Sequence, residues 1–340
     1  MIRIYKSGRH SHRSPLSYPA LADLFAGEVT FVDTPAEADL YLFAHILDVR
    51  DTDEDVVLDW RARKRPVILL SEEPFWDTIW GRAPLQPEIY VDTRFGDLPV
   101  IQLTHATTGI FNYAKLPYYI LTNHRFINAY RARFARNARL GATEWQVRFA
   151  AREVDTAFMF ERRPERFHDA AWPAEGIYGL CAWRTDLAEA CQSGQVERLG
   201  RSWQGGATRW EALDWHVEKL VQLDNHARSI GAIENTHQPN YLTEKLFDAF
   251  ACGARPLYFA SDSHRMHRMK LPGAAWLNLF GLDPADAAEK VAEPFQTPEF
   301  FEAYREAQAR LAALFGDAEI VIEERARLRG AVLDSLIVHL

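Results

Sequence analysis

Short β-rich runs alternate with helix-like stretches through the first half of the chain, and this alternation constrains the fold more than any other feature of the sequence. The runs with the composition of strands are Ile2–Tyr5, Val29–Asp33, Leu40–Ala44, Val67–Ser71 and Val100–Thr104. Between them, residues 16–26 and 54–62 carry apolar side chains at helical spacing. Strands that alternate with helices are typical of a parallel sheet, so we predict an α/β domain here.

The second half resumes the alternation, which predicts a second α/β domain. Its expected strands are Ala157–Phe160, Ile177–Leu180, Ile230–Ile233 and Pro256–Phe259. A chain of 340 residues exceeds the usual size of one domain, so two domains of comparable size are expected. We place the boundary after residue 142, which gives an N-terminal domain of residues 1–142 and a C-terminal domain of residues 143–340.

Helical segments are expected near the boundary and at the end of the chain. Residues 124–151 are rich in Arg, Ala and Phe and form the candidate connector between the domains, with Gly141 as a plausible break. Residues 300–340 are expected to form a helical tail of two helices broken near Gly316 and Asp317, because apolar side chains recur at helical spacing before the break. Such a stripe usually packs against the core.

Composition and charge argue against several classes of protein. The longest apolar runs, such as residues 40–44 and 67–70, are far shorter than the ~20 residues that cross a bilayer, so no transmembrane segment is expected. The amino terminus has no apolar export signal, and three cysteines without CxxC spacing fit a reducing cytoplasm. A net charge of −8, spread through the chain, argues against a nucleic-acid partner.

The most informative segment is residues 229–263, whose order is strand, polar loop, helix, turn and strand. Thr243 is a credible N-cap for the helix, and Gly253 falls where a left-handed residue is expected after the helix. Ligands of open α/β sheets collect at the carboxyl ends of strands and at helix N-termini. We therefore expect a binding site at the loop of residues 234–242 and the first helical turn.

Lys245 and Glu244 lie in this first turn and have both structural and functional interpretations. A cation there faces the positive end of the helix dipole, at a cost of roughly 0.3–1 kcal/mol that a bound anion would reverse. An exposed lysine that tolerates this cost is the alternative, and position alone does not separate the two. Glu244 complements the dipole, so its position alone favours a structural role.

An ordered pattern runs through this segment: Glu234-Asn235, then YLTEKLFDA over residues 241–249, then Gly253, Pro256 and Tyr258. This pattern resembles the donor-site signature of the α1,3/1,4-fucosyltransferases, family ten of the glycosyltransferases. Ile233 departs from it, because the family usually has Phe there. The strong resemblance covers about residues 177–262. Within it Arg184 best matches the arginine that contacts the donor pyrophosphate, with Arg162, Arg163 and Arg166 as nearby competitors.

A weaker resemblance covers the N-terminal half. Ser71-Glu72-Glu73-Pro74 is similar to the element that carries the family's proposed general base, and residues 109–113 are similar to the L-F-N element that follows it. Both Glu72 and Glu73 can be aligned with the base. We favour Glu72, which falls two residues before Pro74. Without the resemblance, a solvated loop carboxylate would be the better interpretation of either residue.

The resemblance implies a GT-B architecture, in which two Rossmann-like domains face each other across a cleft. The N-terminal domain would hold the acceptor glycan and the C-terminal domain GDP-fucose. Lys245 and Arg184 would neutralise the diphosphate, while Asn235, Tyr241 and Glu244 would contact the donor. The expected reaction is an inverting transfer of L-fucose to an acceptor hydroxyl, in an α1,3 linkage to a GlcNAc-type residue.

Two other functions are compatible with the same sequence. One is a non-catalytic nucleotide-sugar or glycan-binding protein of the same fold, and the other is a GT-B enzyme that uses another GDP-sugar. No cofactor and no metal site are expected. The pairs His10/His12 and His264/His267 lack a carboxylate or cysteine at ligand spacing, and the D-x-D in the acidic run at residues 51–55 is better explained by helix capping.

Overall fold

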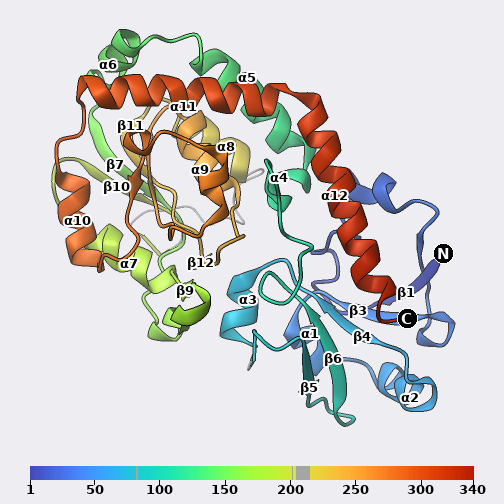
Figure 1. Cartoon of the computed structure of the whole chain (residues 1–340). Coiled ribbons are helices and arrows are strands. Elements are labelled where there is room, and N and C mark those ends of the chain that lie inside the picture. Colours follow the sequence, from blue (N-terminus) through green and yellow to red (C-terminus); the bar gives the residue numbers. More distant parts are fainter. Residues whose placement is uncertain (82, 201, 204–214) are drawn as a thin grey trace. The chain divides into compact units, whose positions relative to one another are not determined.

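The computed structural model describes residues 1–81, 83–200, 202–203 and 215–340 (Figure 1). The chain divides into two compact units, one of residues 1–124 with 321–340 and one of residues 125–320. This division differs from the boundary expected after residue 142. The candidate connector packs almost entirely within the second unit, and the end of the C-terminal tail packs within the first.

A six-stranded sheet in the order β2-β1-β3-β4-β6-β5 forms the centre of the first unit. Its strands are β1 (Ile2–Lys6), β2 (Val29–Phe31), β3 (Leu40–Phe43), β4 (Val67–Leu70), β5 (Glu88–Val91) and β6 (Leu98–Leu103). All neighbouring pairs are parallel except β5 and β6. Every residue of β3 and β4 is buried, as central strands covered on both faces require. The parallel α/β sheet predicted for this half is confirmed, whereas the antiparallel edge strand β5 was not predicted.

Helices cover both faces of this sheet. They are η1 (Pro19–Phe25), η2 (Pro35–Glu37), α1 (Ile46–Arg50), α2 (Glu54–Arg63), α3 (Pro74–Ile79), α4 (Tyr118–Leu121) and the C-terminal α12 (Ala318–Ile337). Leu328 and Leu336 of α12 pack in one core cluster with Ile4 of β1. Val56 and Val57 of α2 belong to a separate cluster. The predicted helix at 54–62 is confirmed, whereas residues 16–26 contain only a 3-10 helix.

The second unit contains a five-stranded sheet in the order β10-β7-β11-β13-β14, with all neighbouring pairs parallel. Its strands are β7 (Val154–Met159), β10 (Val196–Leu199), β11 (Ala227–Gly231), β13 (Arg255–Tyr258) and β14 (Leu277–Asn278). A separate antiparallel sheet contains β8 (Ala171–Trp172), β9 (Ile177–Gly179) and β12 (Thr236–His237). The strand expected at Ile177–Leu180 therefore exists, but it belongs to the small sheet.

The helices of the second unit pack around its parallel sheet. They are α5 (His124–Asn137), α6 (Ala142–Ala150), α7 (Cys181–Ala190), α8 (Trp215–Gln222), α9 (Glu244–Ala251), α10 (Pro284–Ala292) and α11 (Pro298–Gly316), with the short 3-10 helices η3 (Arg166–Asp169), η4 (Pro173–Glu175), η5 (Arg265–Met269) and η6 (Gly273–Ala275). Leu187 of α7 and Val291 of α10 pack with Phe158 and Leu257 of the strands. The predicted helix breaks are confirmed, because Gly141 precedes α6 and α11 ends at Gly316.

Two further features of the chain follow from the described residues. No helix among them is both long enough and apolar enough to span a bilayer. Cys181, Cys191 and Cys252 are buried free thiols. The fold is thus that of two α/β units with parallel sheets. The GT-B prediction concerns how such units are arranged, and it stays a prediction.

Candidate functional site

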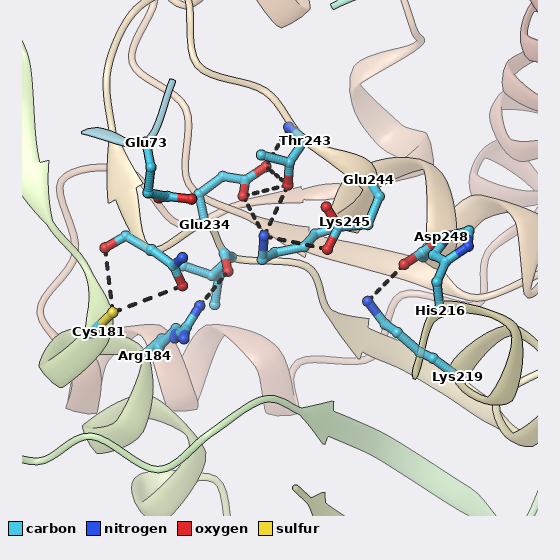
Figure 2. Close-up of polar contacts among 12 residues, drawn as sticks. Glu73, Cys181, Arg184, His216, Lys219, Glu234, Thr243, Glu244, Lys245 and Asp248 are labelled. Carbon is cyan, nitrogen blue, oxygen red and sulfur yellow. Dashed lines mark hydrogen bonds and ion pairs between the residues drawn. The ribbon is translucent and has the colours of Figure 1, made fainter. Parts of the chain in front are cut away.

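The loop between β11 and α9 is organised around the carboxylate of Glu234. Strand β11 is central in the parallel sheet, and Glu234 follows it by three residues. The buried carboxylate accepts hydrogen bonds from the backbone N–H of Thr243 at 2.8 Å, from its hydroxyl at 2.7 Å and from Nζ of Lys245 at 2.8 Å (Figure 2). Glu234 therefore ties the end of the strand to the start of the helix.

Thr243 has the position of an N-cap but does not use its hydroxyl as one. It precedes α9 with extended backbone angles, as predicted. Its hydroxyl donates to Glu234 and accepts from Lys245 Nζ at 2.9 Å, and it makes no capping hydrogen bond to the helix. The backbone N–H groups of the first turn therefore receive no acceptor from the N-cap side chain, and N–H groups at a helix N-terminus bind anions readily.

Lys245 is held between two carboxylates. Its Nζ lies 2.8 Å from Glu234 Oε2 and 3.5 Å from Glu244 Oε1, and its side chain is 18% exposed. Burial alone would lower the pKa of Lys245, but the charges of Glu234 and Glu244 outweigh burial and raise it. The interpretation of Lys245 as an exposed lysine that tolerates the helix dipole does not fit this environment, because two anions stabilise the cation.

Arg184 and Glu244 each carry a buried polar atom without a hydrogen-bond partner among the described residues: Nε of Arg184 and Oε2 of Glu244. Arg184 lies in α7 and is 3% exposed as a residue; its Nη1 donates to the carbonyl of Ile233 at 3.2 Å. Its charge acts on Lys245 by repulsion, so the two cations are neighbours. An unpaired buried polar atom costs about 1–3 kcal/mol, which a ligand that pairs with it recovers.

Asn235 and Tyr241 occupy the same loop but make different contacts. The carbonyl of Asn235 accepts from the backbone N–H of Leu180 at 2.9 Å, and Cys181 Sγ lies 3.9 Å from its side-chain oxygen (Figure 2). These contacts join the start of α7 to the loop. Tyr241 is buried, and its carbonyl accepts from His264 Nε2 at 3.0 Å. The structure thus brings Arg184, Asn235, Glu244 and Lys245 together in the second unit.

A second polar cluster is centred on Asp248 of α9. The buried carboxylate accepts from Lys219 Nζ at 2.7 Å and from the Tyr130 hydroxyl at 2.6 Å, and it lies 2.9 Å from His216 Nε2. Burial would raise the pKa of Asp248, but the charge of Lys219 and the contact with His216 lower it to about 2. The cluster joins α5, α8 and α9, and nothing in the sequence pattern indicated it.

Glu72 in the first unit is fixed by three hydrogen-bond donors. It follows β4, and its side chain is 1% exposed. Oε1 accepts from Arg13 Nε at 2.5 Å and from the Tyr18 hydroxyl at 2.6 Å, and Oε2 accepts from the Tyr118 hydroxyl at 2.6 Å. The interpretation of Glu72 as a solvated loop carboxylate is wrong. Both of its oxygens already accept hydrogen bonds from side chains of the first unit.

Glu73, the alternative base, directly follows Glu72 and precedes α3. Its side chain is 12% exposed, and Oε2 lies 3.9 Å from Arg13 Nη2. Arg13 therefore contacts both candidate glutamates. Arg13 is 59 positions from Glu72 along the chain, so no local pattern could have indicated this contact.

The comparisons with known proteins add no family assignment: no family model matches the sequence, and no match was found among curated proteins. Fold and site define a two-unit α/β protein with a polar site at the carboxyl end of a central strand. The described residues contain no group of three or more His, Cys, Asp and Glu that could hold a metal ion. The resemblance to the fucosyltransferases rests on the motif described above, and membership of that family stays a prediction.

Proposed function

We propose that this protein is an inverting fucosyltransferase that uses GDP-β-L-fucose and has the GT-B architecture. The observation that carries the proposal is the site at the start of α9. There the N-terminus of α9, which Thr243 does not cap, lies beside Lys245, and Arg184 Nε and Glu244 Oε2 are buried without a hydrogen-bond partner among the described residues. An anionic ligand with additional hydroxyl groups would satisfy all of these groups at once.

The donor diphosphate would bind to the cationic side of this site. Glu234, Glu244 and Asp248 formally balance Lys245, Lys219 and Arg184 in charge. Lys245 and Arg184 therefore provide no net positive charge for the diphosphate. The N–H groups of the first turn of α9 would supply the remaining attraction. Glu244 Oε2 and Asn235 would accept hydrogen bonds from sugar or ribose hydroxyls, and Tyr241 would support the loop.

The proposed reaction is a single in-line displacement at the anomeric carbon of fucose. An acceptor oxygen forms the new bond as the bond to the β-phosphate oxygen breaks, so the configuration inverts and GDP leaves with the electron pair. Lys245, Arg184 and the helix N-terminus stabilise the charge that develops on the departing diphosphate. A group of the first unit takes the acceptor proton, and the turn with Glu72 and Glu73 marks the region where we place it.

A transfer assay with GDP-fucose and a glycan panel tests the proposal, with products scored by mass and linkage. Fucose added to a GlcNAc-type residue in an α1,3 linkage is the expected result. Binding of GDP-fucose without transfer to any acceptor would favour the non-catalytic alternative. Transfer from GDP-mannose but not from GDP-fucose would favour another GDP-sugar. No binding of any GDP-sugar would overturn the proposal.

A further inference from the structure

The second unit contains a cavity of about 300 Å³ at the amino ends of two neighbouring parallel strands. Residues 155–156 of β7 and 228–229 of β11 line the cavity on the side of the sheet. The end of α10 and the loop of residues 292–297 line its other wall. Glu234 follows the carboxyl end of β11, so this cavity lies at the opposite edge of the sheet from the site at the start of α9.

The two walls of the cavity differ in polarity. Ala288, Val291 and Phe295 give the helical wall an apolar surface. The sheet wall carries the hydroxyl groups of two buried residues, Thr156 and Ser229. Binding cavities for small molecules usually range over roughly 300–1,000 Å³, so this one suits a small ligand with an apolar body and a polar head group.

The charged side chains that line the cavity are paired. Asp155 forms an ion pair with Arg228, and it also accepts a hydrogen bond from the backbone N–H of Gln195 at 2.9 Å. Glu293 lies exposed at the rim and pairs with Lys290 at 2.6 Å. These two pairs contribute no net charge to the cavity.

Arg255 of β13 adds a positive charge directly behind the lining. Its Nε donates to Ser229 Oγ at 3.1 Å, and its Nη2 donates to the carbonyl of Val291 at 3.2 Å. Its guanidinium lies 3.5 Å from the centroid of the Phe295 ring. Arg255 is 4% exposed, and no carboxylate among the described residues forms an ion pair with it. Burial lowers the pKa of Arg255 to about 9, against a smaller opposite effect of the charge of Glu293, so the guanidinium is still charged at pH 7.

Ser229 connects this cation to the cavity. A hydroxyl group has one donor and two acceptor lone pairs, and Ser229 Oγ uses a lone pair for Arg255. The hydroxyl proton is not used in this bond, and the neighbouring charge makes it a stronger donor to a ligand. The N-terminus of α11, a helix of 19 residues, adds positive potential, because its N-cap residue Thr297 lines the cavity. Both features favour an anionic head group over a neutral one.

We propose that this cavity binds a small carboxylic acid with an apolar body. The carboxylate accepts a hydrogen bond from the Ser229 hydroxyl in the field of Arg255. The apolar body packs against Ala288, Val291 and Phe295. Inorganic phosphate would leave this apolar wall unfilled and should bind more weakly. The site is separate from the one proposed for GDP-fucose, and it does not depend on the proposed function.

Isothermal titration calorimetry with phenylacetate and its neutral isostere phenylacetamide tests the proposal. Phenylacetate should bind with a Kd of about 1 mM or below, and at least about 10-fold more tightly than phenylacetamide. Arg255→Gln should bring the two Kd values to within about twofold of each other, because the unbalanced charge is removed. Equal Kd values for the wild-type protein, or no saturable binding of phenylacetate up to about 20 mM, overturn the proposal.

Two substitutions in α10 show where the acid binds. Ala288→Phe fills the cavity and should weaken phenylacetate binding at least about 10-fold. Ala285→Phe is the matched control, because Ala285 is an exposed residue of the same helix outside the lining, and it should keep the wild-type Kd. An unchanged Kd in Ala288→Phe would mean that phenylacetate binds elsewhere, and it would overturn the proposal.

Alkylation of Cys191 in wild-type protein decides the question if Arg255→Gln or Ala288→Phe is misfolded. Cys191 lines the cavity, and burial raises the pKa of its thiol to about 11, so its reaction with iodoacetamide is slow. Saturating phenylacetate should slow this reaction by at least about fivefold. Cys252 is a buried thiol outside the lining and should keep its rate. An unchanged rate at Cys191 overturns the proposal and leaves the fucosyltransferase proposal intact.

Discussion

Lys245 Nζ lies 2.8 Å from Oε2 of Glu234, eleven positions earlier in the chain, and this ion pair joins the loop after β11 to the first turn of α9. The pair keeps a cation at the positive end of a helix dipole, where it would otherwise be disfavoured. It also means that an anionic ligand must compete with Glu234 for the ammonium group. Affinity for a diphosphate therefore depends on Lys245 in combination with the helix N-terminus.

The first prediction is that GDP and GDP-fucose raise the melting temperature and that Lys245→Ala removes most of this shift. A ligand present at about 100 times its Kd stabilises the folded state by about 2.7 kcal/mol, which corresponds to several degrees in a chain of this size. Lys290→Ala is the matched control. It removes an exposed lysine of the same unit that pairs with Glu293 at 2.6 Å. An undiminished shift in Lys245→Ala would remove Lys245 from the phosphate site.

The second prediction concerns the buried network around Glu72. Glu72→Gln replaces an anion by an amide beside the Arg13 guanidinium and two phenol donors, so we expect a loss of roughly 2–4 kcal/mol in the free energy of unfolding. Tyr118→Phe removes only one donor and should cost about 1 kcal/mol. Urea unfolding of both variants and of the double variant gives the coupling energy, expected at about 0.5–3 kcal/mol. Additive losses would show that the contact does not stabilise the fold.

The third prediction concerns Glu324, which holds the C-terminal helix to the first unit. Its buried Oε1 accepts from the backbone N–H groups of Ala114, Lys115 and Leu116 at 2.8, 2.5 and 3.2 Å. Glu324→Ala should lower the free energy of unfolding by roughly 2–4 kcal/mol, because these donors would lose their acceptor.

Glu323→Ala is the control for Glu324→Ala. Glu323 is exposed and pairs only at the surface with Lys115 Nζ, at 3.1 Å, so its loss should cost at most about 0.5 kcal/mol. Equal costs for the two variants, measured by urea unfolding, would mean that the buried contacts of Glu324 add nothing to stability.

Local sequence patterns predicted the elements of the fold well. Alternating apolar runs located the central strands, and Gly253, with a φ of +79°, ends the α9 segment in the left-handed conformation that was predicted. The domain boundary was less accessible. An amphipathic tail shows that it must pack against a core but not against which sheet, so residues 321–340 were assigned to the C-terminal domain, whereas they belong to the first unit.

The candidate site was predictable only where its residues are close in sequence. The motif from Glu234 to Lys245 is one strand–loop–helix unit, so its members meet through local geometry. His10 and Asp48 are 38 positions apart and meet only because β1 and β3 are neighbours in the sheet. The sequence placed His10 beside His12 as a weak metal pair. The Asp48 carboxylate that pairs with His10 became visible only in three dimensions.

The last prediction uses the buried carboxyl group of Asp77 in α3. Burial, with a smaller contribution from the charge of Glu73, raises the pKa of Asp77 to about 7, and Oδ2 has no hydrogen-bond partner in the described chain. The folded state therefore binds this proton more tightly than the unfolded state, whose carboxyl group titrates near pH 4. The stabilising contribution of the proton is complete below about pH 4 and is lost as the pH rises through about 7.

Asp77→Asn removes this titration while it keeps the shape of the side chain. Its stability relative to wild-type protein should therefore rise by roughly 1–3 kcal/mol between pH 5 and pH 8. Urea unfolding of both proteins at the two pH values measures this change, and the comparison cancels effects of pH on all other groups. Asp92→Asn is the control, because Asp92 is exposed and its replacement should give the same difference at both pH values. If the difference in unfolding free energy between Asp77→Asn and wild-type protein does not change with pH, Asp77 is ionised in the folded protein. Water or a cation would then have to stabilise its charge.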